Sequence, residues 1–189
     1  MSSPAVCDLA PLKRLGRYLV LFPRCVSVFR WQEPPTSIDA FSDSDWGGDL
    51  VTRRSTSGGC ILRGGHLLMH WSRTQQVVSL SSAEAELYGA NRAAAESLGT
   101  QSFATDLGRC VRVRLHIDSS AALSLISRIG LGKAKHIEIQ HLWLQEAVKK
   151  GRVSVQKVPT DINPADIGTK HLHAERISML MGLMNCFYA

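Results

Sequence analysis

The chain has 189 residues, which suits one globular domain of roughly 150 residues with an additional segment. Hydrophobic residues make up 44% and charged residues 20%, which argues against collagen-like, disordered and coiled-coil proteins. Twenty-two Lys and Arg against sixteen Asp and Glu give a net charge of +6, which favours a polyanionic partner. The five cysteines are odd in number and lack Cys-x-x-Cys spacing, so they indicate neither a disulfide framework nor a structural zinc site.

We expect neither a membrane-spanning helix nor a secretion signal in the N-terminal region. Its most apolar stretch, residues 15–31, is interrupted by Arg17, Pro23, Arg24 and Arg30 and is too short for a spanning helix. No clean apolar run precedes a small-residue cleavage site. We therefore expect an intracellular protein, cytoplasmic or nuclear, that is not secreted and does not bind a membrane.

Residues 9–22 are expected to form a short basic amphipathic helix. Leu12, Leu15, Leu19 and Phe22 recur at helical spacing, and three basic residues lie elsewhere on the wheel: Lys13, Arg14 and Arg17. The two consecutive prolines at 34 and 35 then indicate a linker. The expected organisation is an extension, a main domain and a C-terminal helix or tail, covering residues 1–36, 37–172 and 173–189.

The main domain is expected to begin with three antiparallel strands. They are Ser37 to near Trp46, Ser57 to Arg63, and His66 to Trp71. Gly64-Gly65 suits a two-residue hairpin turn between the second and third strands. Ser81-x-x-Glu84 is a capping box, and it predicts the start of a long helix that reaches about Leu107.

The second half alternates between strands and helices. Residues 112–118 alternate strictly, with apolar residues on one face and His116 on the polar face, where we expect it at the surface. The remaining elements are a helix over 119–128, a helix over 137–150, a strand over 152–158 and a last helix after His173. The order βββαβααβα predicts a mixed α/β domain.

Acidic residues lie where these elements begin or end. They are Asp43 and Asp45 late in the first strand, Glu86 early in the long helix, Asp118 after the fourth strand, and Asp166 after Pro164. If the first and fourth strands are parallel neighbours, Asp43 and Asp118 meet beyond their carboxyl ends. Converging carboxylates suit hard divalent cations such as Mg²⁺. The alternative for any one Asp is a turn or a helix cap.

Helical geometry separates the two glutamates of the long helix. Glu86 shares a face with Gly89 and Ala90, whereas Glu84 is rotated by about 200° from Glu86. Small residues on that face let the helix approach the sheet, which brings Glu86 toward Asp43. Glu84 is explained as the capping partner of the preceding serine. A buried Glu86 needs a partner, and a metal ion would provide one.

Five separated motifs resemble, in order and spacing, the ribonuclease H domain of copia-type retrotransposon Pol polyproteins. They are F-S-D-S-D-W-G-G-D…R-R-S-T-S-G from residue 41, H-W-S-R-T-Q-Q-V-V-S-L-S-S-A-E-A-E-L (70–87), H-I-D-S-S-A-A (116–122), K-H-I-E-I (135–139) and V-P-T-D-I-N-P-A-D-I-G-T-K-H-L (158–172). The resemblance covers about residues 38–172. The helix at 9–22 is more loosely similar to the segment that joins the reverse transcriptase to this domain.

The resemblance implies a ribonuclease H-like fold with a five-stranded mixed sheet and a carboxylate set that binds two Mg²⁺ or Mn²⁺ ions. The matching positions are Asp43, Glu86, Asp118 and Asp166. The period of a strand cannot choose between Asp43 and Asp45, so that choice depends on the resemblance alone. The implied activity is hydrolysis of the RNA strand of an RNA–DNA hybrid during reverse transcription, with a reverse transcriptase domain, absent from this chain, as a further partner.

The chain departs from many ribonucleases H near the expected site. The loop 159–164, before the last carboxylate, contains no histidine. His136 belongs to the copia-type pattern and is either near the site or a hydrogen-bonded structural residue. Ser119 follows Asp118 where many relatives have Asn. These departures leave a second hypothesis open, a catalytically silent module that binds hybrids.

Overall fold

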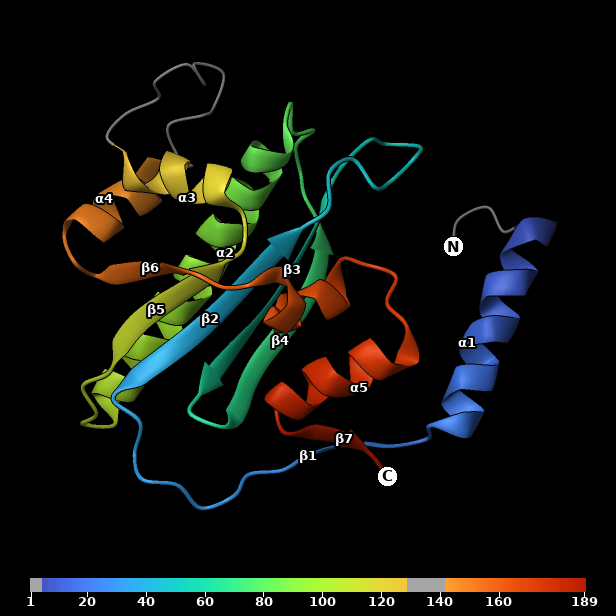
Figure 1. The fold of residues 1–189 in the computed structure, drawn as a ribbon, viewed down its shortest axis with the longest axis horizontal. Helices are drawn as coiled ribbons and strands as arrows, with labels where there is room; N and C mark the ends of the chain where they lie inside the picture. The colour runs from blue at the N-terminus through green and yellow to red at the C-terminus, as the bar shows by residue number, and fades with distance from the viewer. Residues whose placement is uncertain (1–4, 129–141) are drawn as a thin grey trace.

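A five-stranded mixed sheet forms the centre of the protein. The computed structural model describes residues 5–128 and 142–189. The strands are β2 (Ser37–Ser44), β3 (Thr56–Arg63), β4 (His66–Thr74), β5 (Arg112–Ile117) and β6 (Val153–Lys157). Their order is β4-β3-β2-β5-β6 (Figure 1). Strands β2, β3 and β4 are antiparallel, and β5 and β6 run parallel to β2, so the expected mixed α/β fold is confirmed.

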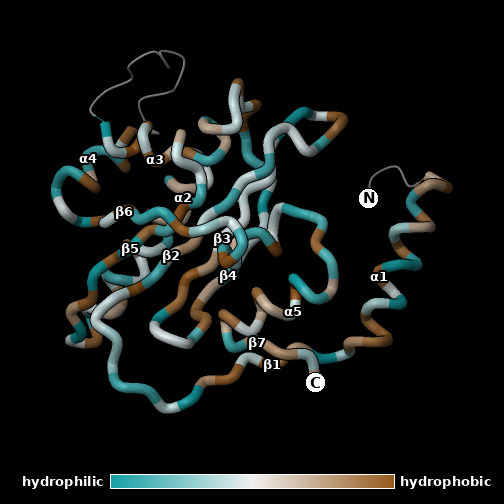
Figure 2. Tube along the Cα trace, in the orientation of Figure 1, coloured by the Kyte–Doolittle hydropathy of each residue, from teal (hydrophilic) through white to brown (hydrophobic). Residues whose placement is uncertain are grey.

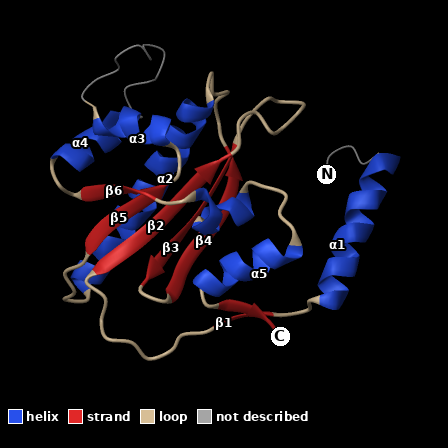
Figure 3. Cartoon of the chain, in the orientation of Figure 1, coloured by secondary structure: helices blue, strands red, loops and turns tan. Residues whose placement is uncertain are grey.

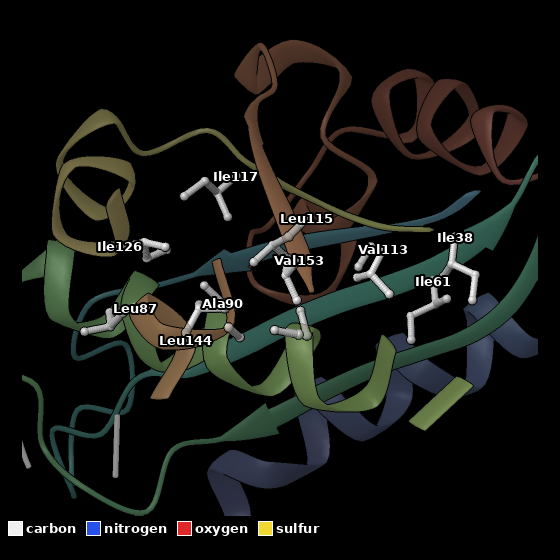
Figure 4. Close-up of a cluster of buried hydrophobic side chains, with 14 of the residues drawn as sticks. Ile38, Ile61, Leu87, Ala90, Val113, Leu115, Ile117, Ile126, Leu144 and Val153 are labelled. Atoms are coloured by element: carbon white, nitrogen blue, oxygen red, sulfur yellow. The ribbon is translucent and has the colours of Figure 1, made fainter. Parts of the chain in front are cut away.

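Three helices build the main core against one face of the sheet. They are α2 (Ser82–Asp106), α3 (Ser120–Ser127) and α4 (Trp143–Lys149). Alternate residues of β2 and β5, among them Ile38 and Leu115, are fully buried against the alanine-rich face of α2 (Figure 4). Removing this apolar surface from water is the main stabilising contribution to the fold.

A smaller apolar cluster lies on the other face of the sheet, under α5 (Ala174–Leu183). Cys60 and Leu62 of β3 pack there with Met181 of α5. The chain then forms β7 (Cys186–Tyr188), which pairs antiparallel with β1 (Cys25–Ser27) in a separate two-stranded sheet (Figure 3). Neither short strand was expected, because three residues are too few for an alternation pattern to be recognised.

Local signals in the sequence predict the turns and helix starts well. Gly64, in the turn between β3 and β4, has a positive φ of 60°. The Ser81 hydroxyl accepts a hydrogen bond from the backbone N–H of Glu84 at 3.2 Å and caps α2. The Glu84 carboxylate accepts from the backbone N–H of Leu80 at 2.8 Å, one residue before the position that the capping box predicts.

The end of the first strand differs from expectation, and the start of one expected helix falls outside the described residues. The first strand ends at Ser44, two residues before Trp46. The helix expected over 137–150 is described as α4 from Trp143 onward. Its expected start lies in residues 129–141, which are outside the described ranges.

The polar face of β5 is partly buried, so the expectation that His116 is at the surface was wrong. The His116 side chain is 15% exposed, and its Nε2 lies 2.8 Å from Oδ1 of Asp39. Its ring stacks on Phe41, with ring centroids 4.6 Å apart. The parallel register, which one strand's alternation cannot reveal, places Phe41 opposite His116 and Asp39 opposite Arg114. Although burial opposes it, hydrogen bonds from His116 and Arg114 lower the pKa of Asp39 to about 2.

Replacing Asp39 with Asn should lower the melting temperature by a few degrees at pH 7. The folded-state pKa of about 2 lies below the ordinary value of 3.8, so the carboxylate stabilises the fold above about pH 4. This stabilisation is lost as the pH falls toward 2. Thermal unfolding of both proteins, followed by circular dichroism from pH 7 to pH 2, should show the difference shrinking below about pH 4. A difference that does not change with pH would contradict the ion-pair explanation.

Helix α1 (Leu9–Leu21) extends away from the domain, and its apolar and polar residues alternate along the tube of Figure 2. Leu12, Leu15 and Leu19 of the apolar stripe are 52–54% exposed. The helix contacts the domain near its end, where Tyr18 lies 2.9 Å from Tyr188, hydroxyl to hydroxyl. None of the helices in the described ranges combines enough length with enough apolar character to cross a membrane.

Two truncations should separate the helix from the segment that follows it. Removing residues 1–21 should change the melting temperature by no more than about 2 °C, because α1 has no buried residue. Removing residues 1–36 should lower it further, because β1 is lost together with Gln32. The Gln32 side chain donates to the Arg63 carbonyl at 2.9 Å and accepts from the Gly65 N–H at 3.0 Å. Equal losses in both truncations, measured by circular dichroism, would contradict this division.

Candidate active site

The carboxylates of Asp43 and Asp118 lie at the ends of neighbouring strands. Asp43 is the last but one residue of β2, and Asp118 directly follows β5. The expectation that these strands are parallel neighbours is confirmed, and Ser42 lies opposite Ile117. Asp43, the next residue of β2, therefore lies beside Asp118, the first residue after β5. Ligands typically bind beyond the carboxyl ends of parallel strands.

Helix α2 adds Glu86 to this pair. One carboxylate oxygen from each of Asp43, Glu86 and Asp118 lies within 4.8 Å of the others. Glu86 also accepts a hydrogen bond from the backbone N–H of Ser44. The helix reaches the sheet so closely because position 89 is glycine. A Cβ atom at Gly89 would lie 2.6 Å from the Oγ of Ser44, a distance that real contacts do not allow.

Glu86 is in an environment that penalises its charge. Burial, followed by the nearby charges of Asp43 and Asp118, raises the pKa of Glu86 to about 8. Its Oε2 is buried and has no hydrogen-bond partner. An unsatisfied buried carboxylate oxygen beside two further carboxylates matches the oxygen donor set of a hard divalent cation. The residues present therefore fit Mg²⁺ or Mn²⁺.

Asp166 comes from the opposite face of the sheet, on the 3-10 helix η4 (Pro164–Gly168). Asn163 caps this helix through the N–H of Ala165 at 3.2 Å. The Asn163 amide also donates to the Ser42 carbonyl at 3.1 Å, which fixes η4 to β2 next to Asp43. Burial raises the pKa of Asp166, although a hydrogen bond from Lys170 opposes this effect.

Three of the four expected carboxylates lie together, and the fourth, that of Asp166, lies apart from them. In the described ranges, the convergent acidic group consists of Asp43, Glu86 and Asp118 and does not include Asp166. Oδ1 of Asp166 instead lies 2.7 Å from the Nζ of Lys170, and its Oδ2 lies 3.7 Å from Arg176.

Two neighbours of Asp43 were not among the residues expected at the site. Lys170 Nζ lies 3.0 Å from Oδ1 of Asp43, so its ammonium group bridges Asp43 and Asp166. The Thr169 hydroxyl donates to Oδ2 of Asp43. Asp166 and Lys170 are only four residues apart, so their ion pair is a local contact. The contact with Asp43 had no local signal, because it joins residues 127 positions apart.

Asp45, the alternative to Asp43, has a turn-forming role in the structure. Its Oδ1 accepts hydrogen bonds from the backbone N–H groups of Thr56 at 2.8 Å and Gly48 at 3.3 Å. The chain turns away from the sheet here, and Gly47 has a positive φ of 62°. The turn, rather than the strand period, therefore separates the two aspartates.

Two further residues, Ser119 and His136, were expected near the site. The Ser119 hydroxyl accepts a hydrogen bond from the N–H of Ala122 at 3.2 Å and caps α3 directly after Asp118. His136 lies outside the described residues, so its expected place near the site stays a prediction.

Comparison with solved structures identifies the fold. No model of a known protein family matches the chain. The structure of LC11-RNase H1, isolated from compost by a metagenomic approach, superposes with a TM-score of 0.51 and covers 71% of this chain and 93% of that one. Their sequence identity is 15%, so the likeness concerns the fold alone. The chain has the ribonuclease H fold.

Its relatives in sequence are Pol polyproteins. The chain is 32% identical over 175 residues to the retrovirus-related Pol polyprotein from transposon RE1 of Arabidopsis thaliana, which covers 91% of this chain. It is 30% identical over 135 residues, 70% of the chain, to that from transposon TNT 1-94 of Nicotiana tabacum. The chain spans only 12% and 10% of these relatives. Its homologues are thus copia-type Pol polyproteins of plant transposons, as its motifs indicated.

Proposed function

We propose that the protein is a metal-dependent endonuclease that hydrolyses the RNA strand of RNA–DNA hybrids, as a part of retrotransposon reverse transcription. One observation carries the proposal. One carboxylate oxygen from each of Asp43, Glu86 and Asp118 lies within 4.8 Å of the others, and Oε2 of Glu86 is buried without a hydrogen-bond partner. The ribonuclease H fold and the homology to Pol polyproteins support it.

Asp43, Glu86 and Asp118 would hold the metal ions, and Asp166 would join them once released from its ion pair with Lys170. Two Mg²⁺ or Mn²⁺ ions, when bound, supply an activated water and stabilise charge on the leaving oxygen of the phosphodiester. Glu86 must give up a proton to act as a ligand, since its pKa is about 8. Thr169 and Lys170 orient the carboxylate of Asp43 from the other face of the sheet.

A basic groove beside the carboxylates supports a nucleic-acid substrate. It has a volume of about 400 Å³ and lies between α2 and the end of β4, with Arg73 and Arg92 in its wall. Ser57 lines the groove and hydrogen-bonds the hydroxyl of Ser44 at 2.9 Å, next to Asp43. Arginines at this position suit the phosphates of a nucleic acid strand, while 2′-hydroxyls would distinguish RNA from DNA.

A cleavage assay with matched duplexes tests the proposal. The same labelled RNA strand is presented in an RNA–DNA hybrid and in double-stranded RNA, with double-stranded DNA of equal sequence as a third substrate. We expect cleavage of the hybrid alone, with Mg²⁺ or Mn²⁺, and none in the presence of a chelator. Folded protein that cleaves no hybrid with either metal would refute the proposal.

A further inference from the structure

We infer that Lys170 is a built-in counter-cation that competes with divalent metal ions for Asp43 and Asp166 and so sets the metal affinity of the site. The inference depends on the proposed function, because it concerns the same carboxylates. Its basis is the position of the Lys170 ammonium group, 3.0 Å from Oδ1 of Asp43 and 2.7 Å from Oδ1 of Asp166.

The lysine is held between two carboxylates. Its ammonium group donates hydrogen bonds to both Asp43 and Asp166. Both carboxylates are almost fully buried, with side-chain exposures of 1% for Asp43 and 3% for Asp166. Without a cation nearby, two such buried charges would be costly. Lys170 therefore stabilises the metal-free protein.

The same contact opposes metal binding. Asp43 belongs to the convergent carboxylates that would hold a divalent ion, Asp166 would join them, and a cation bound there would repel the ammonium group. Lys170 must therefore move when metal binds to both residues. The side chain has room to do so, because it lines an open cavity of about 450 Å³ together with Thr169 and His171. Its side chain is already 38% exposed.

The test is Mn²⁺ binding, measured by isothermal titration calorimetry and by the melting temperature, without any substrate. Lys170→Met removes the charge, Lys170→Gln does so with a polar side chain, and Lys170→Arg retains it. Lys150→Met is the matched control, because Lys150, directly after α4, forms an ion pair of the same four-residue spacing with Glu146 at 2.6 Å. Both of these side chains are exposed. Asp43→Asn reports whether the bound metal occupies the carboxylate site.

We expect Lys170→Met to bind Mn²⁺ about tenfold or more tightly than the wild type, since a cation next to the metal ligands is lost. Its metal-free melting temperature should fall, and Mn²⁺ should raise it by more than in the wild type. Lys170→Arg and Lys150→Met should keep the wild-type affinity. If Lys170→Met does not fold without metal, the Mn²⁺ affinity of Lys170→Gln is measured in its place.

Two other outcomes are distinguishable. If Mn²⁺ binds the wild type, is lost in Asp43→Asn and binds Lys170→Met and Lys170→Gln no more tightly, then the inference is wrong and the proposed function stands. If neither the wild type nor the lysine variants bind Mn²⁺, then metal-dependent function is contradicted and the inference falls with it.

Discussion

Replacing Asp43 with Asn is expected to lower the rate of RNA-strand cleavage by on the order of 10³-fold or more, because a metal site worth several kcal/mol of transition-state stabilisation loses its central ligand. Asp43 is the carboxylate that joins the two parts of the site. It converges with Glu86 and Asp118, and it shares the Lys170 ammonium group with Asp166. Neutralising it affects both parts at once.

The comparison with Asp166→Asn makes this prediction specific. Asp166 lies outside the convergent group and interacts with Lys170 and Arg176, so its loss should reduce activity less than the loss of Asp43. Asp161→Asn is the control, because Asp161 is exposed in the same segment. Initial rates on a labelled hybrid, with folding checked by circular dichroism, give the order. Equal losses for Asp43→Asn and Asp166→Asn would contradict the central position of Asp43.

The second large effect concerns stability rather than activity. Glu86→Gln should raise the melting temperature of the metal-free protein by about 5–10 °C at pH 8. Burial and the neighbouring carboxylates raise the folded-state pKa of Glu86 to about 8 from an ordinary 4.5. Gln resembles the protonated side chain and removes the cost of ionising it.

The sign and the pH window of this effect follow from linkage. Below about pH 4.5 the carboxyl group is protonated in both the folded and the unfolded chain, so the wild type and Glu86→Gln should differ little. Between pH 4.5 and about 8 the unfolded chain gives up this proton while the folded one retains it, which lowers the stability of the wild type alone.

Melting temperatures in a chelator at several pH values test this window. Glu84→Gln is a useful contrast, since the Glu84 carboxylate accepts hydrogen bonds from Leu80 and the Tyr88 hydroxyl, and its replacement should destabilise the fold. If Glu86→Gln melts at the same temperature as the wild type at pH 8, then ionising the buried Glu86 carboxyl group does not destabilise the fold.

Much of the fold was predictable because its elements carry local signals. The alternation over residues 112–118 predicts β5, the capping serine predicts the start of α2, and the order of elements predicts a mixed sheet. The pair of Asp43 and Asp118 followed from one tertiary assumption, that their strands are parallel neighbours. The small residues of α2 then predicted the approach of Glu86.

The features that sequence reasoning missed depend on contacts between distant segments. His116 is partly buried because a neighbouring strand places Asp39 and Phe41 beside it. Strands β1 and β7 stabilise each other across more than 150 residues of chain and have no pattern of their own. The bridging position of Lys170 likewise requires η4 to be fixed against β2, which no spacing within either segment reveals.

Hybrid binding and hybrid cleavage should be measured in parallel, on the wild type and on Asp43→Asn in the same Mg²⁺ or Mn²⁺ buffer. We expect the wild type to bind the hybrid and cleave its RNA strand, and Asp43→Asn to bind the hybrid without cleaving it. Tight binding of the hybrid by the wild type without cleavage, matched by Asp43→Asn in every respect, would refute the proposed nuclease activity. That result would identify a silent hybrid-binding module instead.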